Sequence, residues 1–131
     1  MALFNITAED VARGTLLQPN WYVAEITKCE DDKTKGGDDC VNVYMKALDG
    51  VDEEGNSAPN VPVFRNFMPK YPSFAINFLN ALGANIGKQG KSDLNISDET
   101  CKGKRLKVYI KRGEYNGKGT NEVADFKPLD A

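Results

Sequence analysis

Residues 104–126 read KRLKVYIKRGEYNGKGTNEVADF, and this stretch decides the fold. Aliphatic side chains occupy every second position of its first half and alternate with basic residues and a tyrosine, which is typical of a strand with one buried face. The dipeptide Asn116-Gly117 favours a tight hairpin turn, because both residue types accept positive φ angles. The stretch therefore predicts a strand over 104–112, a turn, and a second strand over about 120–126.

Five further elements are predicted upstream of this hairpin. Alternating apolar and polar residues predict strands over 21–30, 40–49 and 61–67. Phenylalanine and leucine recur every four residues over 73–82, which predicts an amphipathic helix. A capping-box pattern predicts a short N-terminal helical segment over 7–13.

The order of these elements is three main strands, a helix, and a hairpin of two strands. This order predicts an all-β fold with one helix, namely a five-stranded Greek-key barrel of the OB type with the helix between strands 3 and 4. An SH3-like barrel lacks this helix, and a β-sandwich needs about seven strands. The length of 131 residues suits a single domain, which we expect to span residues 1–131.

The composition excludes several classes of active site. The chain contains no histidine, which removes Ser-His-Asp triads, Cys-His pairs and metal sites that need an imidazole. The three cysteines form no C-x-x-C pair. The acidic loop 30–39 carries five carboxylates, but their spacing is not that of an EF-hand. We therefore expect a solvated loop rather than a cation site. We therefore expect no enzyme, no cofactor and no bound metal.

The chain shows no sign of export or membrane insertion. No apolar run approaches the roughly 20 residues that a membrane-spanning helix needs. The first residues, MALFN, lack the basic and apolar regions of a signal peptide, and an odd number of cysteines suits a reducing compartment. We expect a cytoplasmic protein without a membrane partner.

The net charge of −2 conceals a segregation of charge along the chain. Residues 101–119 contain seven basic side chains against Glu114 alone, whereas residues 1–100 contain nine basic and fifteen acidic ones. Such a segment can create a local positive field on an acidic protein, which favours a nucleic-acid partner. The alternative interpretation is a strand with a solvated lysine face.

Binding of single-stranded nucleic acid needs cations for the phosphates and exposed rings for the unpaired bases. OB-folds bind oligonucleotides across strands 2 and 3, between the loops that join strands 1 to 2 and strands 4 to 5. Alternation puts Phe64 and Phe67 on opposite faces, so one of them belongs to the core. Candidate nucleic-acid-binding residues are the basic, aromatic and amide side chains at predicted surface positions: Trp21, Lys33, Lys35, Asn42, Tyr44, Lys46, Arg65, Phe67, Arg105, Lys107, Tyr109, Lys111 and Arg112.

Several short motifs resemble a known family. They are LQPNWY at 17–22, KGG at 35–37, the 74–83 helix ending in ALG, and YNGK at 115–118 followed by NEV at 121–123. Together they are similar to the small OB-fold single-stranded-DNA-binding proteins of tailed bacteriophages. The chain departs from such proteins at 128–131, PLDA, where many of them have a long acidic tail with an apolar tip.

The resemblance implies sequence-tolerant coating of single-stranded DNA during phage DNA replication or recombination, without catalysis. It implies phage replication or recombination proteins as partners, a possible homo-oligomer, and the cytoplasm of the host cell as location. The alternative function is a structural or protein-interaction OB domain, such as a phage virion or assembly component, which the acidic remainder of the chain favours. A metal-dependent nuclease using the carboxylates of 30–39 is disfavoured, because the sequence offers no further ligands.

Overall fold

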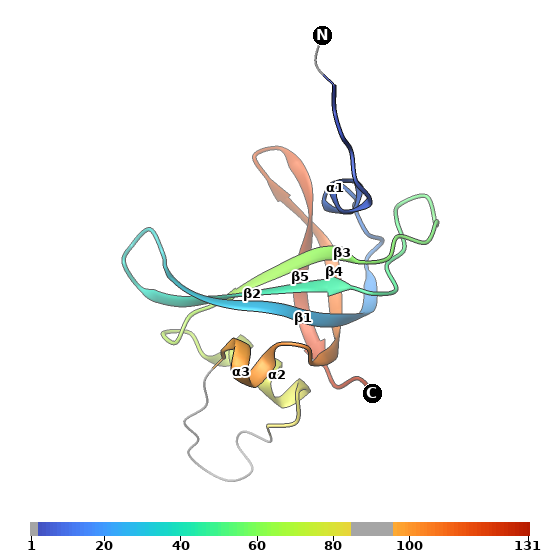
Figure 1. The fold of residues 1–131 in the computed structure, drawn as a ribbon. Helices are drawn as coiled ribbons and strands as arrows, with labels where there is room; N and C mark the ends of the chain where they lie inside the picture. The colour runs from blue at the N-terminus through green and yellow to red at the C-terminus, as the bar shows by residue number, and fades with distance from the viewer. Residues whose placement is uncertain (1–2, 85–95) are drawn as a thin grey trace.

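The computed structural model describes residues 3–84 and 96–131 (Figure 1). Within these ranges the chain forms five strands and three helices. In chain order they are α1 (Ala8–Arg13), β1 (Asn20–Lys33), β2 (Asp39–Ala47), β3 (Val61–Phe67), α2 (Ser73–Ala81), α3 (Asp98–Cys101), β4 (Arg105–Tyr115) and β5 (Lys118–Lys127).

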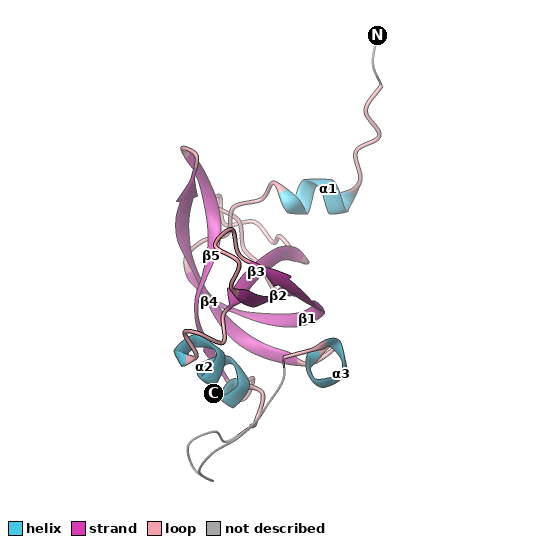
Figure 2. Ribbon diagram, turned by 90° about the vertical axis from the view of Figure 1, so that its left-hand side faces the viewer, coloured by secondary structure: helices cyan, strands magenta, loops and turns pink. Residues whose placement is uncertain are grey.

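The five strands form one antiparallel sheet in the order β3-β2-β1-β4-β5. β1 is long enough to pair with two neighbours, because its residues 20–25 pair with β4 and its residues 24–33 pair with β2. Figure 2 shows α1 on one side of this sheet and α2 and α3 on the other. The predicted main strands and the predicted helix between β3 and β4 are confirmed.

The predicted closure of the sheet into a barrel is wrong. β3 and β5 are the two edges of the sheet, and among the described residues no backbone pairing joins them. A side chain spans the edges instead, since Arg65 Nη1 donates a hydrogen bond to the carbonyl oxygen of Val123 at 3.0 Å.

The inward faces of the strands agree with the alternation of the sequence. Leu106, Val108 and Ile110 of β4 are at most 1% exposed. α2 adds Phe78, which is fully buried and contacts Phe67 of β3 and Phe126 of β5 with ring centroids 5.0 Å and 5.3 Å away. The core therefore lies between the sheet and α2.

β1 contains an irregularity that the sequence analysis did not predict. The register shifts between Ile26 and Lys28, so that Thr27 and Lys28 together oppose Tyr44 of β2. The Thr27 hydroxyl donates a hydrogen bond to the Tyr44 carbonyl oxygen at 3.1 Å. Such a bulge advances the alternation by one position, which puts Lys28 on the outer face beside Tyr44.

Local signals in the sequence agree well with the turns and caps. Asn116 and Gly117 have φ angles of 51° and 77°, as the predicted hairpin turn requires. Thr7 caps α1 and forms a capping box with Asp10. The short helix α3 was not predicted, although Ser97 caps it in the same manner. In the described parts of the chain, none of the helices combines the length and apolarity needed to cross a bilayer.

Candidate nucleic-acid interface

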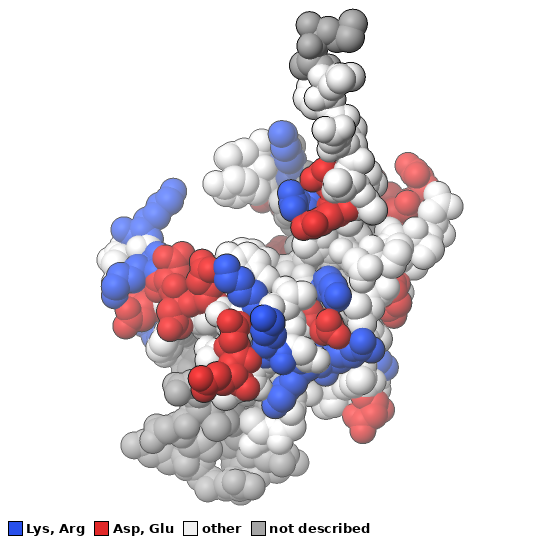
Figure 3. Space-filling view, in the orientation of Figure 1, with Lys and Arg blue, Asp and Glu red and all other residues white. Residues whose placement is uncertain are grey.

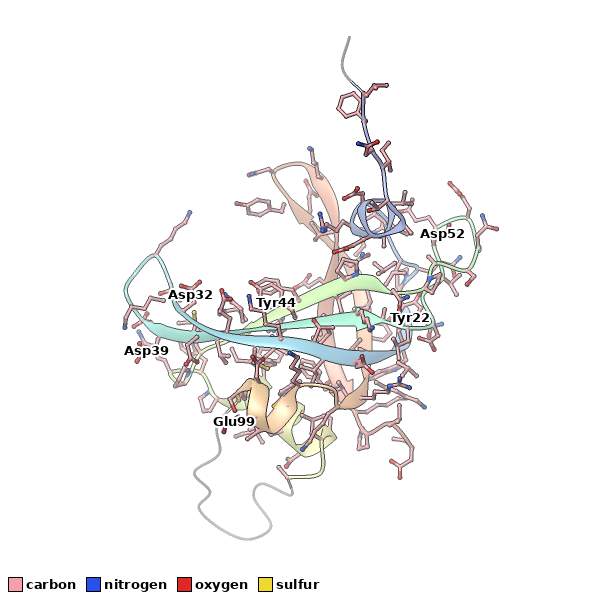
Figure 4. All side chains as sticks on the ribbon, in the orientation of Figure 1. Tyr22, Asp32, Asp39, Tyr44, Asp52 and Glu99 are labelled. Carbon is pink, nitrogen blue, oxygen red and sulfur yellow. The ribbon has the colours of Figure 1, made fainter. Side chains whose placement is uncertain are left out.

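A groove of about 810 Å³ crosses the outer face of β2 and β3. Tyr44 and Phe64 lie on its floor, residues 13–16 at the C-terminal end of α1 line one side, and residues 118–121 of the β4–β5 hairpin line another. Figure 4 shows Tyr44 on the side of β2 that faces α1 and this hairpin, away from α3. The groove therefore lies on the side of the sheet opposite the core.

The two rings on the floor of the groove form a pair. Tyr44 and Phe64 are direct cross-strand partners, with ring centroids 5.5 Å apart and planes inclined by 32°. Phe64 is 48% exposed, and Lys28 Nζ lies 5.8 Å from the centroid of the Tyr44 ring. Tyr44 is half-buried, and rings that keep part of a face open to solvent beside a cation are suited to stacking of unpaired bases.

The predicted surface position of Phe67, a candidate binding residue, is wrong. Its side chain is only 3% exposed and packs against Phe78 and Phe126 in the core. Phe64, which the sequence analysis did not select, takes the exposed position. The signal was present in the sequence, because Phe67 has the same parity as the inward residues Val61 and Val63.

Arg65, predicted as a phosphate contact, lies away from the groove. Arg65 has the parity of the inward residues of β3, and its guanidinium lies over the Phe74 ring at 4.3 Å from the centroid. Its Nη1 bonds the Val123 carbonyl, and its Nε is buried without a partner among the described residues. Arg65 therefore bridges the two edges of the sheet rather than facing the groove.

Replacing Arg65 by lysine is expected to lower the free energy of unfolding by about 1–3 kcal/mol, because lysine has no planar guanidinium to lie over the Phe74 ring while it donates to Val123. Urea denaturation followed by circular dichroism measures this loss. Lys35→Ala, at an exposed turn position, is the control and should unfold like the parent. If Arg65→Lys leaves the midpoint unchanged, Arg65 does not hold the edges together.

A second ring pair lies on β1 and β4. Trp21 and Tyr109 are direct cross-strand partners with ring centroids 5.5 Å apart in an edge-to-face arrangement. Lys127 Nζ lies 4.3 Å from the centroid of the Trp21 ring, and Lys107 Nζ donates to the carbonyl oxygen of Ala131 at 2.7 Å. The structure thus brings three predicted residues together and adds Lys127, which the sequence analysis missed.

Most of the predicted phosphate contacts are paired with carboxylates. Lys33 Nζ lies 2.6 Å from Asp39, and Lys111 Nζ lies 3.9 Å from Glu122. Figure 3 shows basic and acidic side chains next to one another over much of the face of the molecule that it displays. Three of the seven basic side chains of residues 101–119 therefore have a carboxylate partner in the fold, namely Arg105, Lys111 and Arg112. The remaining paired candidates are Arg112 with Glu53, and Lys46 and Arg105, which share Glu25.

Glu25 is the centre of a three-residue ion-pair network. Its Oε1 lies 3.1 Å from Arg105 Nε, and its Oε2 lies 3.5 Å from Lys46 Nζ. The hydrogen bond from Arg105, with the charge of Lys46 added, holds the pKa of the Glu25 carboxyl below its usual value. Glu25 is therefore ionised at neutral pH.

The remaining candidates lie toward the β1–β2 hairpin. Asn42 accepts a hydrogen bond from Asn66 Nδ2 at 2.8 Å and donates one to Asp32 at 3.3 Å. Lys35 is exposed at the turn. The acidic residues of this hairpin do not converge, and within residues 3–84 and 96–131 no three Cys, Asp or Glu side chains are placed to share a metal ion.

Comparison of the whole chain with protein-family models and with curated proteins found no match.

Proposed function

We propose that this protein binds single-stranded DNA with little sequence preference, across the outer face of β2 and β3. The observation that carries the proposal is the pair formed by the half-buried Tyr44 ring and the exposed Phe64 ring on the floor of a groove. Every base has an apolar face, so stacking on such rings does not depend on sequence. The proposed role is that of a binding protein without catalytic activity.

The arrangement of the strands supports an OB-type fold whose sheet is open between β3 and β5. The long β1 is shared between β2 and β4, and a helix follows β3. OB-folds are five-stranded, partly open barrels that bind oligonucleotides on strands 2 and 3, flanked by the loops between strands 1 and 2 and between strands 4 and 5. The groove lies on the corresponding strands, and the β4–β5 hairpin borders it.

Cations near the groove are suited to the phosphates of a bound strand. Lys118 lines its side together with Arg13, which pairs with Glu9 and Asp10. Lys28, which pairs with Glu30, stands beside the Tyr44 ring. Lys33 and Lys35 lie on the projecting β1–β2 hairpin. The proposed placement puts the bases on the rings and the phosphates toward these side chains.

The resemblance to phage proteins supports a role in phage DNA replication or recombination within the host cytoplasm. The proteins of those processes are the proposed partners, and self-association on a long DNA strand is a proposed mode of action. The second ring pair, Trp21–Tyr109, is a proposed extension of the binding surface.

A fluorescence titration tests the proposal. The protein is titrated into labelled oligo-dT, oligo-dA and duplex DNA at several salt concentrations. We expect both single strands to bind more tightly than duplex, with a log–log salt slope of roughly −0.7 for each phosphate contact. Duplex binding as tight as that of oligo-dT, or binding without salt dependence, contradicts the proposal.

One observation favours the second candidate function, a protein-interaction or structural domain. Leu3, Phe4 and Ile6 are 90%, 81% and 71% exposed in the segment before α1, which extends away from the sheet (Figure 1). Several exposed apolar side chains close together in the chain are typical of a contact with another protein. Failure to bind oligo-dT, together with self-association that Phe4→Ser abolishes in sedimentation experiments, would favour this function.

A further inference from the structure

Glu25 lies between the two ring pairs on the outer face of the sheet. Trp21 and Glu25 have the same parity on β1, and the bulge brings Lys28, beside Tyr44, onto that face as well. The partners of Glu25 come from the two neighbouring strands, because Lys46 is opposite it on β2 and Arg105 is opposite it on β4. A DNA strand that contacts both ring pairs must pass over this network.

In this network two cations hold one carboxylate, as the cations of a phosphate-binding site hold a phosphate. Arginine and lysine hold phosphate oxygens with the same charge-assisted hydrogen bonds that they make to a carboxylate. The side chains of Lys46 and Arg105 are 38% and 53% exposed, so a phosphate can reach both cations from solvent. Glu25 itself is 24% exposed between them.

We propose that Glu25 is an internal mimic of a DNA phosphate, which competes with bound single-stranded DNA for Lys46 and Arg105. This inference rests on the proposed function. Lys46 and Arg105 together carry a charge of +2, and the Glu25 carboxylate reduces the net charge of the network to +1. A bound strand therefore meets one net positive charge here instead of two, and Glu25 lowers the affinity of this surface for DNA. The physical consequence is easier release of the strand.

Replacing Glu25 by glutamine removes the charge but keeps the shape of the side chain. We expect Glu25→Gln to bind oligo-dT roughly fivefold more tightly at low salt, since a unit charge at about 4 Å in water is worth about that factor. The log–log salt slope should become steeper by about 0.7, the value for one additional cation. Fluorescence titration at several salt concentrations measures both quantities.

Glu99→Gln is the matched control. It removes the same charge from an exposed position on α3, on the other side of the sheet from Tyr44 (Figure 4). This variant should bind like the parent. Equal gains in Glu25→Gln and Glu99→Gln would show a general effect of net charge and overturn the inference.

A second background separates competition for the two cations from the mere loss of a negative charge. In the double variant Lys46→Ala/Arg105→Ala, adding Glu25→Gln should leave the salt slope unchanged, because the cations for which Glu25 competes are absent. A slope that steepens there as much as in the single variant overturns the inference, as does an unchanged slope in the single variant. Melting curves confirm that each variant is folded.

The binding of the parent distinguishes the two possible failures. If the parent does not bind oligo-dT, the proposed function fails and this inference fails with it. If the parent binds but Glu25→Gln binds equally well, only the inference fails.

Discussion

Tyr44→Ala is expected to weaken the binding of oligo-dT about 5- to 150-fold, without changing the salt slope. Stacking of a base on an aromatic ring contributes about 1–3 kcal/mol, and 1.4 kcal/mol corresponds to a tenfold change in affinity. Stacking releases no counterions, so the loss should be the same at each salt concentration. Phe64→Ala should have a similar effect, because the two rings form one pair on the floor of the groove.

Two variants make this result specific. Tyr44→Phe keeps the ring and should bind like the parent. Tyr71→Ala removes a ring that is 63% exposed outside the residues lining the groove, and it should also bind like the parent. If Tyr44→Ala is folded, as judged by its melting curve, and still binds oligo-dT with parental affinity, the groove is not the binding surface.

Val108→Asp is expected to unfold the protein. Val108 is fully buried at the centre of β4, and an unpaired carboxylate there loses its hydration without gaining a partner. The expected loss of about 4–5 kcal/mol or more is comparable to the whole stability of many small domains. Circular dichroism at 25 °C, compared with the parent across a urea titration, measures the outcome.

The control is Lys107→Glu at the neighbouring position of the same strand. Lys107 is half-buried on the outer face, opposite Lys127, so an acidic side chain there reaches solvent and gains an opposite charge across the strands, which offsets the lost bond to Ala131. Its unfolding midpoint should stay within a few tenths of a molar urea of the parent value. Similar losses in Val108→Asp and Lys107→Glu would mean that the two faces of β4 are not distinguished by burial.

The parts of the fold that depend on neighbouring residues could be predicted from the sequence. The turn at Asn116 and Gly117 requires only that both residues accept positive φ, and the buried face of β4 follows from strict alternation. The helix at 73–81 follows from the spacing of its rings. Each of these signals lies within about ten residues, so no knowledge of the rest of the chain was needed.

The features that were missed depend on residues that are far apart in the chain. The sheet stays open where Arg65 reaches a carbonyl oxygen 58 positions away, and no local pattern encodes that distance. Glu25 neutralises Arg105 across 80 positions, so counting charges along the sequence could not reveal the pairing. The candidate site was therefore predicted by residue type and strand, whereas its charge balance became visible only in the folded chain.

The bulge in β1 also determines which changes of length this strand can accept. Ahead of Thr27, odd-numbered residues such as Glu25 face outward, whereas after it even-numbered residues such as Lys28 do so. A deletion of Thr27 that left a regular ladder would join the two segments without a shift, because each side chain keeps the face it already has. An insertion or deletion elsewhere in β1 would exchange the faces of every residue up to the next irregularity. Among one-residue changes of length in this strand, a loss at either of the two bulge positions, Thr27 or Lys28, is thus compatible with the same buried and exposed sets elsewhere in the strand.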